Sequence, residues 1–482
     1  MENEKFHIIL LREAGVLRSH KIKTGEITKD FVDGLFVKKY EDIKEEIDSE
    51  ASVNDEEQLP APYPLNFKEV EKAFSQAMSM YRDAVVATVR MAPPISSLMA
   101  AQNIENIASK RGEKVHDLCS EDKEVYSLPM HTIHKVLQHL THEKAVLEGA
   151  LYLPKISTIG LISSYDAILS DLLRVIFQEK PEIIFTSDRE IKFSELTGFG
   201  SIEAAKESIT SKEIESIVRQ SHHEQFFWME RKFNIKLREG LDIWPNFVEL
   251  CERRNLLTHT GGLVSEQYLK NCEKYGQATR LRVGEKLDVD LAYFKRAIEI
   301  VSEIGYKLIH TMWRKFSPKD RRVADLVLNE CGMNLIAAKQ YPLAEKILEF
   351  GVKQRSHSSD LVKRMMIVNF ANALKLGGDF EKCKKVLSAN DWSATSYHFQ
   401  ICVAAVKNEI DEVVRLLRLG PQTIEIDPSQ FRDWPVFADV RKNDDVKTTF
   451  EEIFGEPLIK TEGSNSSAPG IIEDSELIAE KV

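Results

Sequence analysis

An arginine, an asparagine and a histidine lie close together in the stretch CERRNLLTHTGG. They are Arg254, Asn255 and His259. Asn255 and His259 are four residues apart and would share one face of an α-helix, and the long side chain of Arg254 could reach the same point. Arginine offers phosphate a permanently charged fork of donors, and histidine can give or take a proton near neutral pH. These residue types could therefore cleave RNA without a metal ion.

The residues around this cluster predict the element that carries it. Apolar residues recur at helical spacing before and within the cluster, at Phe247, Leu250, Cys251 and Leu257. The pattern breaks at Gly261 and Gly262, which is typical of a glycine that ends a helix. We therefore expect an amphipathic helix that holds His259 in its last turn.

The stretch resembles the HEPN family of all-α domains, whose nuclease members carry an Arg-x(4–6)-His motif, often as Arg-Asn-x-x-x-His. Arg254, Asn255 and His259 match this motif residue for residue. Arg253 also fits the looser spacing, and the adjoining asparagine favours Arg254. The resemblance covers roughly residues 155–315, where ISTIGLISSYDAILSDLLRVIFQ is similar to the long first helix of such a domain.

The resemblance implies a composite site, formed when two HEPN domains pair as a homodimer. The implied reaction is attack of an RNA 2′-hydroxyl on the adjacent phosphate, without metal or cofactor, leaving a cyclic phosphate and a 5′-hydroxyl. His259 would act as general base or acid, Arg254 would stabilise charge on the phosphate, and Asn255 would orient the histidine or the backbone. Such an activity would suit antiviral defence or a toxin-like stress response. The alternative is a noncatalytic scaffold or a nucleotide-binding regulatory protein.

Composition limits the other possibilities. The chain has 482 residues, of which 43% are hydrophobic and 29% charged, as expected for a soluble globular protein in the cytoplasm with no membrane segment. Its net charge of −11 disfavours broad coating of nucleic acid, so any RNA contact should be local, through Arg253, Lys270 and Lys274. The six cysteines form no Cys-x-x-Cys pair, which argues against a thiolate zinc site or a disulfide framework.

Further polar residues could support the site. His222 and His223 precede the aromatic run FFW, and Asp166 and Asp171 lie on the predicted first HEPN-like helix. The sequence does not show which way these side chains face. A histidine-rich helix with members at His131, His134, His139 and His142 offers metal-ligand spacing, but it lacks a His-Glu-x-x-His arrangement.

The expected fold is mostly α, a HEPN-like helical bundle followed by a short α-solenoid. An N-terminal segment, 1–40, has uncertain structure that could include strands. An acidic, proline-containing linker at 41–65 leads to a helical region, 66–150, interrupted at Pro93 and Pro94. The HEPN-like domain follows at 151–315, helical repeats and a cap at 318–455, and a disordered tail at 456–482.

The repeats are predicted from three stretches that align with one another. They align on Tyr341, Phe380 and Ile410, and again on Ala344, Cys383 and Val413. The spacings bracket the tetratricopeptide period of about 34 residues, and the pattern resembles that family's helix–turn–helix repeat. The resemblance implies about three degenerate repeats that bind a protein or peptide partner. Plain helical hairpins that bury one another remain the alternative.

Overall fold

The computed structural model describes residues 5–13, 16–23, 66–120, 123–185, 198–277 and 280–459. The protein is mostly helical, which confirms the expected fold class. The chain divides into two compact units, Met1–Asp320 and Arg321–Val482. The predicted linker at 41–65 and almost all of the predicted tail lie outside the described residues.

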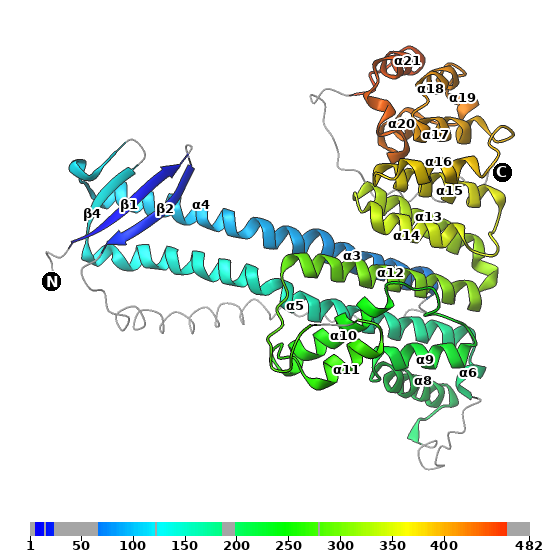
Figure 1. Ribbon diagram of the computed structural model, residues 1–482, viewed down its shortest axis with the longest axis horizontal. Coiled ribbons are helices and arrows are strands. Elements are labelled where there is room, and N and C mark those ends of the chain that lie inside the picture. The colour runs from blue at the N-terminus through cyan, green and yellow to red at the C-terminus, as the bar shows by residue number, and fades with distance from the viewer. Residues whose placement is uncertain are drawn as a thin grey trace. The chain divides into compact units, whose positions relative to one another are not determined.

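A long helical hairpin dominates the first half of unit 1 (Figure 1). Its first arm is continuous and consists of α3 (Phe67–Ser79), the π-helix η1 (Met80–Val85) and α4 (Val86–Arg111). Its second arm is α5 (Ile133–Glu179), which packs along α4 and α3. The capping box of Asn66 and Glu69 starts α3, because each side chain accepts a hydrogen bond from the other residue's backbone N–H.

A small antiparallel sheet joins the two arms of the hairpin. Its strands are β1 (Lys5–Glu13), β2 (Val16–Lys23), β3 (Glu113–Lys114) and β4 (Lys123–Pro129), in the order β2-β1-β4-β3. Ile8 of β1 lies opposite Ile22 of β2 and Tyr126 of β4. Short 3-10 turns, η2 (His116–Leu118) and η3 (Met130–Thr132), lie before and after β4.

The structure corrects three details of the predicted helical region 66–150. The region contains the strands β3 and β4, which the helical pattern of its flanks did not indicate. Pro93 and Pro94 lie inside α4 and do not interrupt it, although they leave two backbone carbonyls of the preceding turn without their helical donors. The predicted boundary between residues 150 and 151 falls in the middle of α5. Helix α4 also packs along α5.

Two helical stretches in the described part are long and apolar enough to cross a membrane, Phe67–Arg111 and Met130–Glu179. In the most apolar 18-residue stretch of each, only 17% and 33% of the residues are buried. Core helices of a globular protein can satisfy the same length and composition. Such low burial, however, leaves apolar side chains on the surface of the hairpin.

The rest of unit 1 is a helical bundle around the second half of α5. Its helices are α6 (Glu182–Phe185), α8 (Ile202–Val218), α9 (His222–Phe233), α10 (Trp244–His259), α11 (Glu266–Lys274) and α12 (Leu291–Phe316). The 3-10 turn η4 (Pro318–Asp320) closes the unit. Large buried rings fill the centre, and burial of each is worth roughly 1.5–3 kcal/mol: Tyr165, Phe226, Phe247, Phe294 and Trp313.

Unit 2 contains three consecutive helix pairs. They are α13 (Arg321–Ala337) with α14 (Tyr341–Val352), α15 (Asp360–Leu376) with α16 (Phe380–Ser388), and α17 (Tyr397–Lys407) with α18 (Ile410–Leu417). The aligned residues Tyr341, Phe380 and Ile410 are the first residues of the three second helices. Two positions before each of them stands a residue with positive φ: Lys339, Gly378 or Asn408. The repeat read from the sequence is therefore also a repeat of backbone conformation.

Aromatic residues close the end of unit 2. The closing elements are α19 (Pro421–Ile424), α20 (Pro428–Asp433), η5 (Pro435–Phe437), η6 (Val440–Lys442) and α21 (Asp444–Phe454). Phe431 stacks on Phe437 with ring centroids 4.3 Å apart, and the ring of Phe450 lies 5.5 Å from that of Phe431. All three side chains are fully buried, so this segment covers the last helix pair.

Candidate functional site

Helix α10 carries the motif and ends where the sequence predicts. Pro245 lies in its first turn, where a missing N–H costs little, and the predicted apolar positions are buried. His259 is its last residue. The chain then turns through Gly261 and Gly262, which have φ values of +62° and +95°.

The turn after His259 is fixed by a close approach of two backbones. Leu287 N–H donates to the carbonyl of Gly262 over 2.8 Å, and a Cβ on Gly262 would lie only 2.7 Å from the Leu287 carbonyl oxygen. Only glycine fits both this φ and this approach. The turn therefore fixes the direction in which α10 ends, and with it the position of His259.

Arg254 reaches across the bundle to an aspartate of α5. Its Nη2 donates to Oδ2 of Asp166 over 3.1 Å. The other carboxylate oxygen of Asp166, Oδ1, lies 2.9 Å from Nε2 of His222, the first residue of α9. One carboxylate thus connects three helices, and it holds the Arg254 guanidinium in a defined place.

This polar cluster is partly sheltered from solvent. The side chains of Arg254 and Asp166 are each 21% exposed, and that of His222 is 8% exposed. The His222 ring lies against the buried ring of Phe247, with centroids 5.7 Å apart. Nε of Arg254 is buried and has no hydrogen-bond partner among the described residues. The partly exposed guanidinium is also a permanently charged donor group of the kind that binds an anionic oxygen.

Glu252 belongs to the same junction, and no pattern in the sequence indicates this. Its side chain is half-buried, and that burial raises the pKa of the carboxyl above its usual value. A hydrogen bond with Asn271 of α11, and the nearby His222 and Arg254, act in the opposite direction. Glu252 stands two residues before Arg254 in the sequence, but its surroundings come from α9 and α11, which the sequence alone does not place beside it.

His259 and Asn255 stand apart from the cluster. The His259 side chain is exposed, and within the described parts of the chain it makes no hydrogen bond or ion pair. Asn255 is half-buried and likewise has no side-chain partner there. Nζ of Lys155 on α5 lies 3.4 Å from the carbonyl oxygen of Gly261, just beyond His259. The end of α10 is therefore open, and within one chain no direct contact joins Arg254 to His259.

Arg253 points to a different face of α10 from Arg254. Its Nε donates to Glu249 over 2.7 Å, its Nη1 donates to the Asp288 carbonyl over 3.0 Å, and its guanidinium lies over the Tyr293 ring at 4.0 Å. Glu249 also accepts from the hydroxyls of Tyr268 and Tyr293. These contacts hold α11 and α12 against α10, so Arg253 has a structural role here.

The two predicted RNA-binding lysines are exposed on α11. Lys270 and Lys274 are one helical turn apart. Nζ of Lys274 lies 5.0 Å from the centroid of the Tyr275 ring, and that ring lies 4.9 Å from the ring of His223. Lys274 therefore borders the junction of α9 and α11, close to the cluster. Asp171 interacts with Arg174 on α5, and burial raises the pKa of its carboxyl.

Comparison with protein-family models, curated proteins and solved structures finds no match. In the described residues there is also no group of three or more His, Cys, Asp or Glu side chains that could hold a metal ion. The functional argument therefore depends on the residues and their geometry.

Proposed function

We propose that this protein is a metal-independent endoribonuclease that works as a homodimer. The observation that carries the proposal is the placement of Arg254. Asp166 holds the partly exposed guanidinium of Arg254, five residues before the exposed imidazole of His259 on the same helix. Phosphodiester transesterification requires a fixed cation and a free proton carrier at one phosphate, and α10 carries one group of each kind near its C-terminal end.

The proposed reaction needs no group beyond the side chains and the RNA. One imidazole takes the proton of the RNA 2′-hydroxyl, whose oxygen then bonds to the adjacent phosphorus. The bond from phosphorus to the 5′-oxygen breaks, and that oxygen takes a proton from an imidazolium. Arg254 stabilises the charge on the non-bridging oxygens, and Asn255 orients the reacting groups. The products are a 2′,3′-cyclic phosphate and a 5′-hydroxyl.

In this proposal the active site contains groups from two copies of the chain, because one chain supplies only one of the two imidazoles that the reaction needs. The step needs a base and an acid at the same time, and each chain supplies one His259 in this motif. Arg254 and His259 of one chain are not in contact within the described structure. Two α10 ends facing each other would bring two imidazoles and two guanidiniums to one phosphate.

The contact with RNA is local in this proposal. Lys270 and Lys274 are exposed on α11, Lys274 lies near His223 through the ring of Tyr275, and Lys155 lies beside the turn that follows His259. The net charge of −11 restricts binding to such a patch. We further propose that the helix pairs of unit 2 bind a protein or peptide that controls the nuclease, because paired-helix arrays commonly serve as binding surfaces.

A noncatalytic scaffold is the second candidate, and one observation favours it. The charge of Arg254 is already offset by Asp166, so this arginine could serve the fold alone. In that case His259 would be an ordinary exposed residue at a helix end.

Cleavage of RNA by purified full-length protein distinguishes the two. The substrate is a mixed pool of transfer and ribosomal RNA in the presence of a chelator. We expect the wild type to cleave, and His259→Ala and Arg254→Ala to lose on the order of 100-fold or more in rate. His116→Ala, an exposed histidine of η2, is the matched control and should cleave like the wild type. Equal rates for wild type and His259→Ala would favour the scaffold.

A further inference from the structure

A cavity of about 410 Å³ opens between α10, α11 and α12, on the face of α10 that carries Arg253. Asn246 and Glu249 line it from the same helix, and their spacings of three and four residues place them on that face with Arg253. Arg254 is not among the described lining residues. Sites for small ligands enclose roughly 300–1,000 Å³. The cavity is therefore separate from the cluster around Arg254 and large enough for a small molecule.

One carboxylate lines this cavity among the described residues, and the protein already neutralises it. Glu249 accepts a hydrogen bond from Nε of Arg253 over 2.7 Å. It also accepts from the hydroxyls of Tyr268 and Tyr293, over 2.7 and 2.8 Å. Its side chain is only 12% exposed. Glu249 and Arg253 thus form a closed pair that contributes no net charge to the cavity.

Two more arginines line the cavity without a counter-charge. Arg280 follows α11 and Arg296 lies on α12, and both are exposed. The guanidinium of Arg296 lies 5.9 Å from the centroid of the Tyr293 ring. Within the described parts of the chain, neither arginine forms an ion pair with a carboxylate. The cavity therefore has two positive charges that the protein does not balance.

The loop that carries Arg280 is attached to the bundle. Leu281, the next residue, packs against the buried apolar cluster that joins α11 to the end of α10. Further along the loop, Gly284 N–H donates to the Val264 carbonyl over 2.9 Å, and Val264 N–H donates to the Glu285 carbonyl over 2.8 Å. These contacts keep Arg280 beside the cavity.

The rest of the lining suits an organic group with few polar atoms. Leu281, Tyr293 and Ile300 are half-buried and offer apolar or aromatic surface. Asn246 and Gln277 are half-buried amides whose side chains make no hydrogen bond within the described residues. Each amide can both donate to a ligand and accept from it. The cavity thus combines unbalanced positive charge with an apolar surface.

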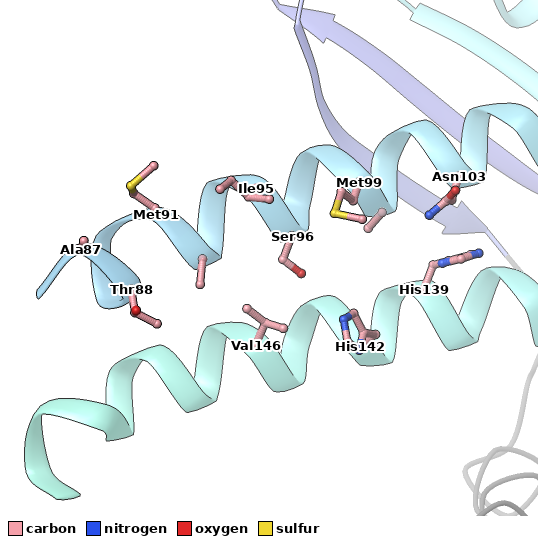
Figure 2. Close-up of a pocket in the computed structure, with 12 residues that line it drawn as sticks. Ala87, Thr88, Met91, Ile95, Ser96, Met99, Asn103, His139, His142 and Val146 are labelled. Carbon is pink, nitrogen blue, oxygen red and sulfur yellow. The ribbon is translucent and has the colours of Figure 1, made fainter. Parts of the chain in front are cut away.

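Charge distinguishes this cavity from the larger groove between α4 and α5. That groove encloses about 580 Å³, and its lining includes Met91, Ile95, Met99, His139 and His142 (Figure 2). No lysine, arginine, aspartate or glutamate is among its described lining residues. Its apolar lining does not indicate which molecule covers it, whereas the cavity between α10, α11 and α12 has the charge of an anion site.

We infer that the cavity between α10, α11 and α12 binds a small organic phosphate monoester. Such a phosphate carries a charge of about −1.5 to −2 at neutral pH, which matches two arginines without a counter-charge. A carboxylate or an RNA phosphodiester carries only one negative charge. Arg280 and Arg296 hold the phosphate oxygens through charge-assisted hydrogen bonds, and the organic group lies against Leu281, Tyr293 and Ile300. The site is additional to the proposed nuclease site.

Calorimetric titration of the full-length protein with phenyl phosphate tests the site, at a pH of about 8, where the phosphate is a dianion. This probe carries both a phosphate and an aromatic ring. We expect saturable binding with a Kd of about 1 mM or tighter. Phenyl sulfate has the same shape but a single negative charge, so it should bind about tenfold more weakly. Inorganic phosphate lacks the ring and should also bind more weakly.

Two independent variants should weaken the binding of phenyl phosphate. Arg280→Gln with Arg296→Gln should cost about tenfold or more in affinity, because each arginine supplies a charge-assisted hydrogen bond. Ile300→Trp fills the cavity without removing a charge and should also weaken binding. The control, Arg219→Gln with Arg231→Gln, removes two exposed arginines from other parts of unit 1 and should bind like the wild type. Circular dichroism should show the same helical content in all variants.

AMP, as a second phosphate monoester, distinguishes the possible sources of the phosphate. Tighter binding of AMP than of phenyl phosphate would identify a nucleotide, and weaker binding would identify an ester with a smaller organic group. The titrations contain no cleavable RNA, so their result is independent of the proposed nuclease reaction.

Three results would overturn the inference. One is the absence of binding by phenyl phosphate and AMP at about 1 mM. Another is binding that is unchanged in Arg280→Gln with Arg296→Gln, because the ligand would then lie elsewhere. The third is displacement of phenyl phosphate by an RNA oligonucleotide with 2′-O-methyl groups, which would assign the cavity to an RNA strand instead.

Discussion

At the residue scale, the role of Arg254 depends on its ion pair with Asp166. The pair could position the guanidinium for catalysis or serve only the stability of the fold. The carboxylate of Asp166 holds Arg254 and His222 at once, at 3.1 and 2.9 Å. The carboxylate comes from α5 and the two basic groups from α10 and α9, at sequence separations of 88 and 56 residues. No local pattern predicts such a contact. The sequence suggested that Asp166 and His222 could reach the site, but it could not show their orientation.

Asp166→Asn should weaken both the fold and the cleavage. Asparagine keeps the size of the side chain but removes the charge opposite a partly buried guanidinium, so we expect a loss of roughly 1–3 kcal/mol in the free energy of unfolding. Urea denaturation measures this. The control is Asp360→Asn, which breaks an exposed ion pair with Arg364 on α15 and should cost about 0–1 kcal/mol. An Asp166→Asn protein as stable as this control would mean that Asp166 does not hold Arg254 in solution.

Glu252 should make stability depend on pH. Burial raises the pKa of its carboxyl in the folded chain above the ordinary value of 4.5, so the folded state holds the proton more tightly than the unfolded state. Its contribution to stability is full below 4.5 and is lost as pH rises through the raised pKa. Glu252→Gln, which keeps a hydrogen-bonding partner for Asn271, should therefore be more stable than the wild type at neutral pH. Denaturant titrations across pH measure the difference in free energy of unfolding between the variant and the wild type, which should vanish in acid. A difference that is the same at every pH would contradict this account.

At the scale of elements, α10 and its turn were predictable because their signals are local. The apolar spacing and the two glycines lie within a few residues of the motif. The helix pairs of unit 2 were predictable for the same reason, since each repeat has its own turn. The hairpin was not foreseen. Pro93 and Pro94 predict a break, yet α4 is continuous and packs along α5, which is distant in sequence.

Gly262 should tolerate substitution far less well than Gly261. Both have positive φ, but a Cβ on Gly262 would lie 2.7 Å from the Leu287 carbonyl, whereas a Cβ on Gly261 would meet nothing within 4 Å. We expect Gly262→Ala to lower the melting temperature and the cleavage rate, since the strained turn would move the end of α10. Gly261→Ala should lower the free energy of unfolding by about 1 kcal/mol, because only the positive φ disfavours alanine at this position. Equal losses for the two variants would rule out the close approach as the cause.

At the scale of the whole molecule, the chain combines two compact units with different tasks in our proposal. Unit 1 holds the cluster of Asp166, His222 and Arg254. Unit 2 holds the repeated helix pairs that we propose bind a controlling partner. The acidic net charge fits an enzyme that selects its RNA through a small basic patch rather than one that coats it.

The chemistry of the cleavage products tests the central proposal most directly. The full-length protein is incubated in chelator with an RNA oligonucleotide and with the same sequence carrying 2′-O-methyl groups throughout. Transesterification predicts cleavage of the first alone, with cyclic-phosphate and 5′-hydroxyl ends, and no cleavage by His259→Ala. Cleavage of both oligonucleotides, or products with 5′-phosphate ends, would contradict a reaction that begins at the 2′-hydroxyl.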